Sequence, residues 1–307
     1  MFLELNVAES RMDRFRRLSL RADDVISQSS RPEIKIADNL SEWEASYQLH
    51  YDEYLRAGYV KEASSSRMIF NIHNLLPETV VLVTKISDMM VSTLTQFFDD
   101  PVFGLPLDMI YKKELDKLRT QGRSISEIGS LVTRNDFRWQ NLFMHLCQAM
   151  YWYARFQKVD DLCIAVNPKH TRFYETVFLF EQIGPKKFYP KVHAPAVLMR
   201  LDATRHEEKM KAVYDRMEDE CNLHNRWHRM DGRDITDYFL PLKHKNILPK
   251  RNKPTMDSTD VNLLLGCNQG ILNGLSLDQA YYLKCIYPKI KLLHLVYSSR
   301  SSDSGIC

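Results

Sequence analysis

The chain has 307 residues, of which 44% are hydrophobic and 26% are charged, an ordinary balance for a soluble globular protein. Its net charge of +3 is too small to indicate a nucleic-acid partner, and no apolar run approaches the roughly 18 residues that span a bilayer. Six scattered cysteines without a Cys-x-x-Cys pair, and residues 1–20 without the apolar stretch of a secretory signal, favour a reduced, cytoplasmic protein.

Composition and periodicity divide the chain into three regions. Residues 1–32 form a basic arm without clear periodicity, residues 33–203 alternate predicted helices and strands, and residues 204–307 form an extension that is expected to be mainly helical. The alternation in the second region predicts a mixed α/β layered domain. The sequence of the extension indicates no role for it.

The first predicted helix begins at Ser41, which has the spacing of a capping box with Glu44. Aromatic side chains then recur at helical spacing, at Trp43, Tyr47, Tyr51 and Tyr54. Aromatic residues spaced in this way are usually core residues, and the alternative is that they line an apolar substrate pocket.

The patterns that follow predict a hairpin, a helix, a strand, a helix, a strand, a helix and two strands. They cover residues 80–95, 106–118, 125–132, 139–156, 162–166, 168–177, 181–183 and 196–201. The strand over residues 162–166 is almost continuously apolar, so we expect it to be buried on both faces of a sheet.

In the extension, residues 205–229 are predicted as one charged helix and residues 240–260 as irregular. Ser276 and Gln279 form a capping box for a helix that ends at Ile286. A zinc site is the alternative interpretation of one face of the charged helix, where three side chains share the spacing i, i+3, i+7: Cys221, His224 and His228. No second pair at metal-ligand spacing accompanies them, so we expect no metal.

Two segments of the central region resemble the core of the GNAT acyltransferase superfamily. They are residues 126–143, Ser-Glu-Ile-Gly-Ser-Leu-Val followed by Phe-Arg-Trp-Gln-Asn-Leu-Phe, and residues 165–174, Ala-Val-Asn-Pro-Lys-His-Thr-Arg-Phe-Tyr. The finer pattern resembles the long-chain N-acyl amino acid synthases, which are related to the acyl-homoserine lactone synthases. The Asn-Pro-x-His-x-x-Phe-Tyr block is its most specific part, and the similarity covers about residues 33–203.

This resemblance implies a mixed central sheet flanked by helices, in which two parallel strands splay apart and their free backbone groups bind the pantetheine arm of an acyl donor. The splayed strands would be residues 125–132 and 162–167, with Asn167 fixing the opening, and a backbone N–H there would face the oxyanion. The alternative for Asn167 is a turn-forming role before Pro168. The donor-binding candidates are Leu131, Val132, Arg138, Asn141, Asn167, His170 and Phe173.

Glu127 is the candidate general base, because an attacking amine must lose a proton to a group within reach. The alternative is a structural carboxylate paired with an arginine. Tyr174 is the candidate proton donor to the leaving thiolate. Since a thiol has a pKa of about 8.5, the thiolate can leave unaided, and a packing role for Tyr174 is the alternative.

Family members that use coenzyme A resemble one another in an Arg-x-x-Gly-x-Gly/Ala loop whose glycines admit the pyrophosphate. Here Arg138 is kept, but Asn141 and Phe143 occupy the glycine positions. A donor with one phosphate needs less of this cradle, so we expect phosphopantetheine on an acyl carrier protein, with acyl-coenzyme A as the alternative. Basic residues that would steer an acidic carrier, or simply form a solvated face, are Arg138, Lys169, Arg172, Lys186, Lys187 and Lys191.

The sequence therefore predicts an acyl carrier protein-dependent N-acyl amino acid synthase with a small amino-acid acceptor and no resident cofactor. Its acyl-chain or acceptor pocket would contain Trp43, Tyr47 and Tyr51. One alternative is an acyl-homoserine lactone synthase that uses S-adenosylmethionine, and another is a non-catalytic acyl-binding module. A lipid-like product is compatible with peripheral membrane contact.

Overall fold

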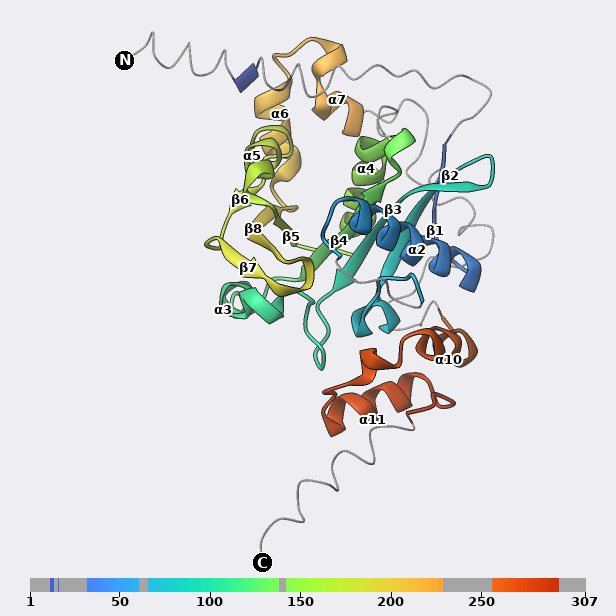
Figure 1. Ribbon diagram of the computed structural model, residues 1–307. Coiled ribbons are helices and arrows are strands. Elements are labelled where there is room, and N and C mark those ends of the chain that lie inside the picture. Colours follow the sequence, from blue (N-terminus) through green and yellow to red (C-terminus); the bar gives the residue numbers. More distant parts are fainter. Residues whose placement is uncertain are drawn as a thin grey trace, which may run out of the picture.

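The computed structural model describes residues 32–60, 66–137, 142–228 and 256–292, together with Met12, Asp13 and Arg16. Its strands are β1 (Glu33–Ile36), β2 (Val80–Ile86), β3 (Met89–Phe98), β4 (Ile125–Thr133), β5 (Asp161–Val166), β6 (Glu181–Gln182), β7 (Lys187–Tyr189) and β8 (Ala194–Asp202). In this part of the chain they form one mixed sheet in the order β1-β2-β3-β4-β5-β8-β6, with β7 also paired to β8 (Figure 1). The β4–β5 pair is parallel and the other pairs are antiparallel.

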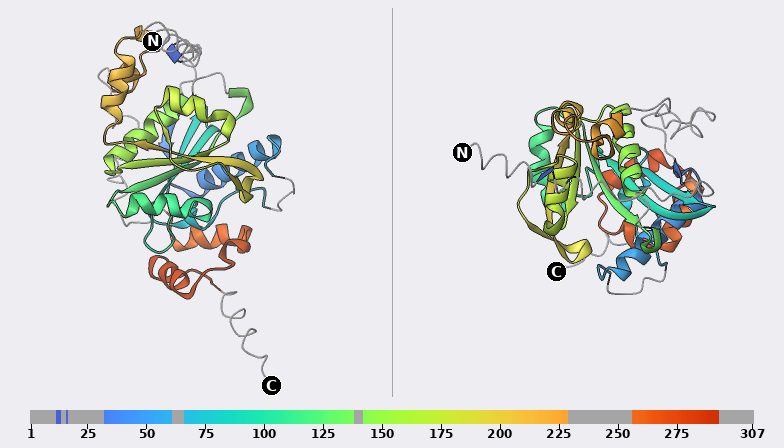
Figure 2. Two further views of the ribbon diagram at one scale, coloured as in Figure 1. Left: turned by 90° about the vertical axis from the view of Figure 1, so that its left-hand side faces the viewer. Right: turned by 90° about the horizontal axis from the view of Figure 1, so that it is seen from above.

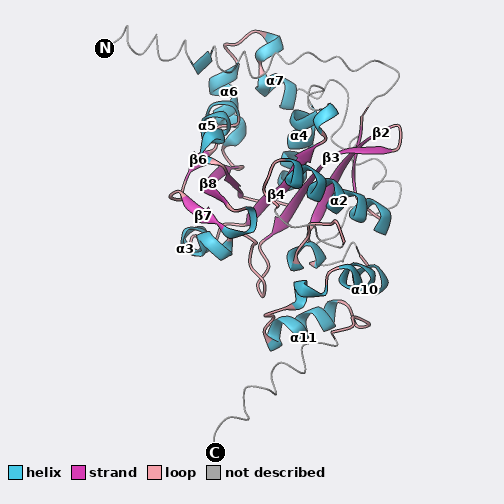
Figure 3. Ribbon diagram, in the orientation of Figure 1, coloured by secondary structure: helices cyan, strands magenta, loops and turns pink. Residues whose placement is uncertain are grey.

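Helices cover both faces of this sheet (Figure 3). They are α2 (Leu40–Arg56), α3 (Asp108–Arg119), α4 (Leu142–Phe156), α5 (Thr171–Val177), α6 (His206–Tyr214), α7 (Leu223–His228), α10 (Ser258–Cys267) and α11 (Leu277–Ile286). Strand β2 shows how the layers form: Val80 and Leu82 enter the core beneath α4, whereas Val81 and Val83 enter the core beneath α2. Because successive side chains of a strand point to opposite faces, an apolar run of this kind is buried on both faces of the sheet.

The predicted α/β class and most of the predicted order of elements are confirmed, and two short strands were missed. Strand β1 is four residues long with polar side chains on alternate positions, and β7 is three residues long and directly precedes Pro190. Such short edge segments carry too little periodicity to be read from one sequence.

The predicted capping box of the first helix is wrong. The N-cap of α2 is Asn39, whose side-chain oxygen accepts a hydrogen bond from the backbone N–H of Glu42 at 3.1 Å. Ser41 instead donates its hydroxyl to the same Asn39 oxygen at 2.6 Å. Asparagine and serine are both good N-caps, so the spacing to an acidic residue three positions later did not decide between them.

The predicted single helix over residues 205–229 is also wrong. Helix α6 ends at Tyr214, a 3₁₀ turn covers Asp219–Cys221, and α7 starts afresh because the Asn222 side chain accepts from the backbone N–H of Asn225 at 2.9 Å. The three suggested zinc ligands therefore do not share one helix face. Cys221 is buried in the core, whereas His224 hydrogen-bonds Asp215 at 2.9 Å. The described residues hold no group of three or more His, Cys, Asp or Glu side chains arranged for a metal ion.

The extension packs against opposite ends of the domain (Figure 2). Helices α6 and α7 join the core beneath α4, and α10 and α11 join the core beneath α2, where the Tyr287 hydroxyl donates to the carbonyl of Leu75 at 2.6 Å. The capping box of Ser276 and Gln279 is confirmed, whereas α10 begins inside the range predicted to be irregular. None of the described helices is long and apolar enough to cross a membrane.

A buried carboxylate fixes the start of β5. Asp161 is fully buried and binds two guanidinium groups, those of Arg123 at 2.8 Å and Arg200 at 2.6 Å. Removing one member of a buried ion pair leaves its partners with an uncompensated charge. We therefore expect Asp161→Ala to lower the free energy of unfolding by about 3 kcal/mol, measured by denaturant titration.

The matched control is Asp52→Ala, which removes a carboxylate from an exposed pair with Arg67. Exposed pairs are screened by water, so the unfolding midpoint of this variant should hardly move. Equal losses in the two variants would contradict the role given to Asp161.

Candidate active site

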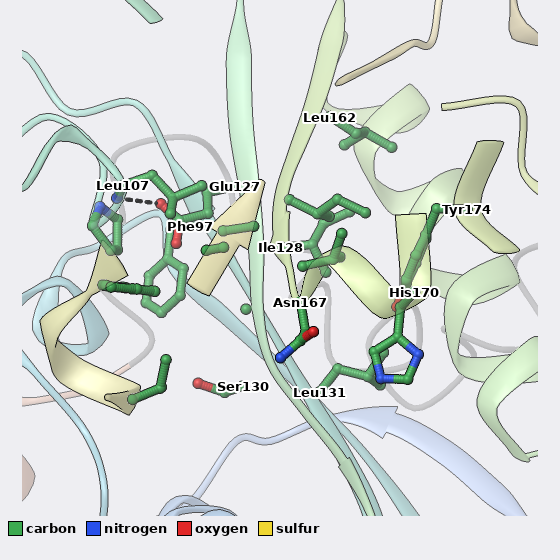
Figure 4. Close-up of a pocket in the computed structure, with 18 of the residues that line it drawn as sticks. Phe97, Leu107, Glu127, Ile128, Ser130, Leu131, Leu162, Asn167, His170 and Tyr174 are labelled. Atoms are coloured by element: carbon green, nitrogen blue, oxygen red, sulfur yellow. Dashed lines mark hydrogen bonds between the residues drawn. The ribbon is translucent and has the colours of Figure 1, made fainter. Parts of the chain in front are cut away.

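The two central parallel strands separate partway along their length. Pairing between β4 and β5 consists of Ile125 with Asp161, Ser126 with Leu162, and Glu127 with Cys163, although β4 continues to Thr133 and β5 to Val166. Both strands lie wholly within the described residues. The predicted splay between residues 125–132 and 162–167 is thereby found, and Figure 4 shows Asn167 between Ser130 and His170.

A bulge on the other edge of β4 accompanies the separation. Thr93 and Thr95 of β3 face Val132 and Gly129, so β4 has one residue more than β3 between these pairs, and Ser130 has a φ of +52°. A bulge of this kind bends the strand and redirects its backbone, and bulges are frequent beside active sites. Here it bends the half of β4 that has left β5.

A cavity of about 330 Å³ occupies the gap between the strands. Part of its lining is apolar and belongs to the core beneath α4, and this part is called the apolar branch. The apolar branch consists of Cys147, Met150, Tyr151, Leu162, Ile164, Phe178, Phe180, Leu201 and Trp227. The polar side chains lie in the rest of the lining. Glu127 and Leu107 lie on one side of the gap, and His170 and Tyr174 lie on the other (Figure 4).

Glu127 is the buried carboxylate at the point where the strands separate. Its side chain is 5% exposed and accepts a hydrogen bond from the backbone N–H of Leu107 at 2.7 Å. Burial raises the pKa of Glu127 to about 8, and the Leu107 hydrogen bond and the charge of Lys191 only partly oppose the rise. A carboxyl group with this pKa can hold or accept a proton near neutral pH.

The turn that supplies the Leu107 N–H is itself fixed. Gly104 has a φ of +62°, and a side chain at this position would collide with the carboxylate of Asp108. That carboxylate accepts from the backbone N–H of Leu105 at 2.9 Å and binds Arg119 at 2.7 Å. Arg119 binds Asp99 as well, at 2.7 Å, so one guanidinium ties both ends of the turn together.

Helix α2 contributes to the cavity wall through Tyr54, one of the aromatic residues considered above as pocket lining, and through His50, which the sequence did not indicate. His50 and Tyr54 line the cavity, and their rings meet edge to face with centroids 4.1 Å apart. Neither ring nitrogen of His50 has a hydrogen-bond partner of ordinary geometry among the described residues, and burial lowers its pKa to about 4. A neutral buried imidazole facing a cavity can bind a polar group of a ligand.

The donor-binding candidates divide into three groups. Leu131, Asn167 and His170 line the cavity, and the Asn167 side chain also accepts from the backbone N–H of Lys169 at 3.2 Å, as a turn-forming asparagine does. Val132 is buried outside the lining, and Phe173 packs with Phe143 and Phe178 instead. Arg138 and Asn141 lie outside the residues that the structure describes.

The remaining candidates also differ in position. Tyr174 lines the cavity, packs against the ring of Phe178, and has a pKa that burial raises, so its phenol is neutral. Trp43, Tyr47 and Tyr51 are buried but do not line the cavity.

The basic residues expected near the donor site are not equivalent. Lys169 and Arg172 are exposed beside the cavity-lining His170, and Lys186 is exposed further along the chain. Lys187 binds Glu114 at 2.9 Å and the carbonyl of Ile110 at 2.8 Å. Lys191 lines the cavity itself and attracts the Glu127 carboxylate.

An open α/β sheet whose central parallel strands part around a cavity is the GNAT-like acyltransferase fold, and the chain is an N-acyltransferase of this class. Residues 45–202 match the family described as N-acyl amino acid synthase FeeM. Because this match spans half of the chain, the protein belongs to that family, and the resemblance seen in its sequence is confirmed.

The chain is also similar to several solved structures. FeeM, an N-acyl amino acid synthase from uncultured soil microbes, is 25% identical, with 59% of this chain and 95% of that chain covered and a TM-score of 0.53. BjaI, a CoA-dependent acyl-homoserine lactone synthase, is 15% identical over 64% of this chain and 100% of that chain, with a TM-score of 0.45. An acyl-CoA N-acyltransferase from Pseudomonas aeruginosa is 17% identical over 56% and 99%, with a TM-score of 0.40. No curated protein matches the chain.

The raised pKa of Glu127 makes stability depend on pH. Folding raises this pKa from 4.5 to about 8, so between these values the folded protein binds more protons than the unfolded chain. The contribution of this group to stability is therefore lost as the pH rises through that window. We expect the free energy of unfolding to fall more steeply from pH 5 to pH 8 in the wild type than in Glu127→Gln, measured by denaturant titration at each pH. Parallel curves for the two proteins would contradict the raised pKa.

Proposed function

We propose that the protein transfers a long-chain acyl group from a phosphopantetheine thioester on an acyl carrier protein to the amine of an amino acid. The observation that carries this proposal is one cavity that joins an apolar branch, the gap between β4 and β5, and the buried carboxylate of Glu127. These three parts correspond to the acyl chain, the thioester and the amine.

The donor would enter where the strands have separated. Free backbone groups of β4 and β5 can hydrogen-bond the amides of a pantetheine arm, as a sheet edge binds an extended peptide. The acyl chain would then occupy the apolar branch, where each buried methylene contributes about 0.8 kcal/mol. This arrangement puts the thioester carbonyl in the gap beside the bulge at Ser130, in the same cavity that Glu127 lines.

The acceptor would bind through two opposite charges. An amino acid carries an amine that must reach the base and a carboxylate that needs a cation. Glu127 and Lys191 both line the cavity and interact by charge, so they can bind the two ends of one small zwitterion. His50 and Tyr54 would then face the acceptor side chain.

The ammonium group of the acceptor first loses one proton to solvent, and Glu127, in its ionised form, accepts the second proton as the neutral amine attacks. The amine nitrogen bonds to the thioester carbon, and a backbone N–H of the gap stabilises the oxyanion. The carbon–sulfur bond then breaks to leave an amide and a thiolate. Tyr174 is a neutral phenol in the cavity, and it can protonate the sulfur.

A carrier protein is the proposed donor because large side chains replace the glycines of the coenzyme A loop. Phe143 is in the first turn of α4 and packs against Phe173 and Phe178. Lys169 and Lys186 are exposed and would meet an acidic carrier. We do not assign this role to Lys187, which is held by Glu114. A carrier protein and a cytoplasmic location remain predictions from the sequence.

The direct test is to incubate the protein with a long-chain acyl carrier protein and a mixture of amino acids, and to identify the products by mass spectrometry. We expect N-acyl amino acids, and a higher kcat/KM with the carrier-bound donor than with acyl-coenzyme A. Methylthioadenosine formed from S-adenosylmethionine would instead identify an acyl-homoserine lactone synthase. Bound lipid with no turnover on any amine would contradict the proposal.

Glu127→Gln should lower kcat by about 100-fold or more, because glutamine can still accept from Leu107 but cannot take a proton. The wild-type rate should rise with pH through about 8 as Glu127 ionises, and the variant should lose this dependence on Glu127. Unchanged turnover in the variant would remove Glu127 from the mechanism.

Lys191→Met should raise KM for the amino acid about tenfold, the equivalent of one lost charge-assisted hydrogen bond. The amide of the same amino acid, which lacks the carboxylate, serves as the control substrate. Its KM should be similar in wild type and variant. An equal effect on both substrates would argue against a carboxylate contact at Lys191.

A further inference from the structure

We propose that Trp227, on α7 of the C-terminal extension, forms a wall of the apolar branch and limits the longest acyl chain that the enzyme accepts. The inference rests on the proposed function, because it takes the apolar branch as the acyl site. Trp227 is 3% exposed and lines the cavity.

The apolar branch follows one face of β5. Leu162, Ile164 and Val166 alternate on the strand and all enter the core beneath α4. Asn167 follows at the open end of the gap, and Leu162 lies beside the last β4–β5 pairs. At about 3.3 Å per residue, the path from Asn167 to Leu162 is roughly 16 Å. An acyl chain that enters beside Asn167 therefore runs toward Leu162 and the residues around it.

Trp227 forms part of the wall that faces this side of β5. Its ring centroid is 5.4 Å from that of Tyr151, on α4, and 5.5 Å from that of Phe178. Phe178 also packs against Phe143, in the first turn of α4. The Trp227 indole therefore borders the apolar branch where α4 and Phe178 meet.

The backbone beneath the indole is tied to α4, so the wall is rigid. The Trp152 indole N–H donates to the carbonyl of Trp227 at 3.1 Å, and the Gln148 amide donates to the carbonyl of Arg226 at 3.2 Å. A fixed wall can exclude an acyl chain that is too long, because a densely packed protein interior is destabilised by even one extra methylene.

The wall comes from outside the part of the chain that matches the family. That match ends at residue 202, and α7 is reached only after the helix break at Asn222. The family core would therefore bind the thioester and perform the chemistry, while the extension decides how much of the acyl chain fits. This gives residues 204–228 a role in donor selection.

The test compares wild type with Trp227→Phe and Trp227→Leu on a series of saturated acyl donors that differ by two carbons, all on one carrier protein. The smaller side chains should shift the maximum of kcat/KM toward longer donors. Each additional methylene that becomes buried should raise kcat/KM for the donor about fourfold, the equivalent of about 0.8 kcal/mol. The KM for the amino acid should not change.

Trp43→Phe is the matched control, because Trp43 is as deeply buried but packs in the other core and does not line the cavity. It should leave the chain-length profile unchanged. An unshifted profile in both Trp227 variants, or an equal shift in Trp43→Phe, would overturn the inference.

Calorimetric binding of S-alkyl phosphopantetheine thioethers decides the same question without turnover. Trp227→Phe, the milder substitution, should bind the longer thioethers more tightly than wild type does. If the wild type binds the thioethers but transfers no acyl group, the proposed function is wrong, and the binding data still test the chain-length inference. If the variant shows the wild-type order of affinities, the chain-length inference is wrong and the proposed function is unaffected.

Discussion

The whole site depends on one interruption of hydrogen bonding in the middle of the sheet. After Glu127 and Cys163, β4 and β5 continue without pairing each other. Unpaired backbone groups inside a protein are costly unless something else satisfies them, so a gap in a central parallel pair needs a reason to persist. The gap borders a cavity, where a substrate with amide groups can complete the pairing. The buried Asp161 cluster fixes the strands on one side of this gap, and the bulge at Ser130 bends β4 away on the other.

The gap also explains the properties of Glu127. The carboxyl group lies at the last paired position, where the sheet is still closed and water is excluded, and one N–H from a fixed turn is its hydrogen-bond donor. Burial therefore outweighs that single bond, and the pKa rises to about 8. Ionisation of this buried group lowers the stability of the folded protein at high pH. The same burial gives Glu127 a pKa near the pH at which a general base must accept a proton. Charge from Lys191 moderates the rise and, in the proposed function, binds the acceptor.

Much of this was predictable because the relevant residues lie on regular elements. Glu127 and Asn167 could be placed on neighbouring strands because the motifs around them resemble the GNAT core, and the α/β class followed from the order of elements. The pocket wall on α2 was only partly predictable. Trp43, Tyr47 and Tyr51 are core, whereas Tyr54 of the same aromatic pattern lines the cavity, and spacing alone does not separate the two cases. His50 lines the cavity as well, and no feature of the sequence indicated it. The position of Trp227 could not be predicted for another reason. The charged stretch around it has the pattern of one continuous helix, but the Asn222 cap starts a new helix there. The indole of this second helix lines the cavity.

The protein thus combines a family core, which supplies the gap and the base, with an extension that packs at both ends of the domain. Amide hydrogen exchange tests the central claim most directly. In the free protein, those amides of residues 128–131 and 164–166 that face the gap, rather than β3 or β8, should exchange faster than the amides of residues 125–127 and 161–163. A long-chain S-alkyl phosphopantetheine thioether should slow exchange of these gap-facing amides. Full protection of the gap-facing amides without the thioether, or no change when it binds, would contradict a gap between β4 and β5 that binds the acyl donor.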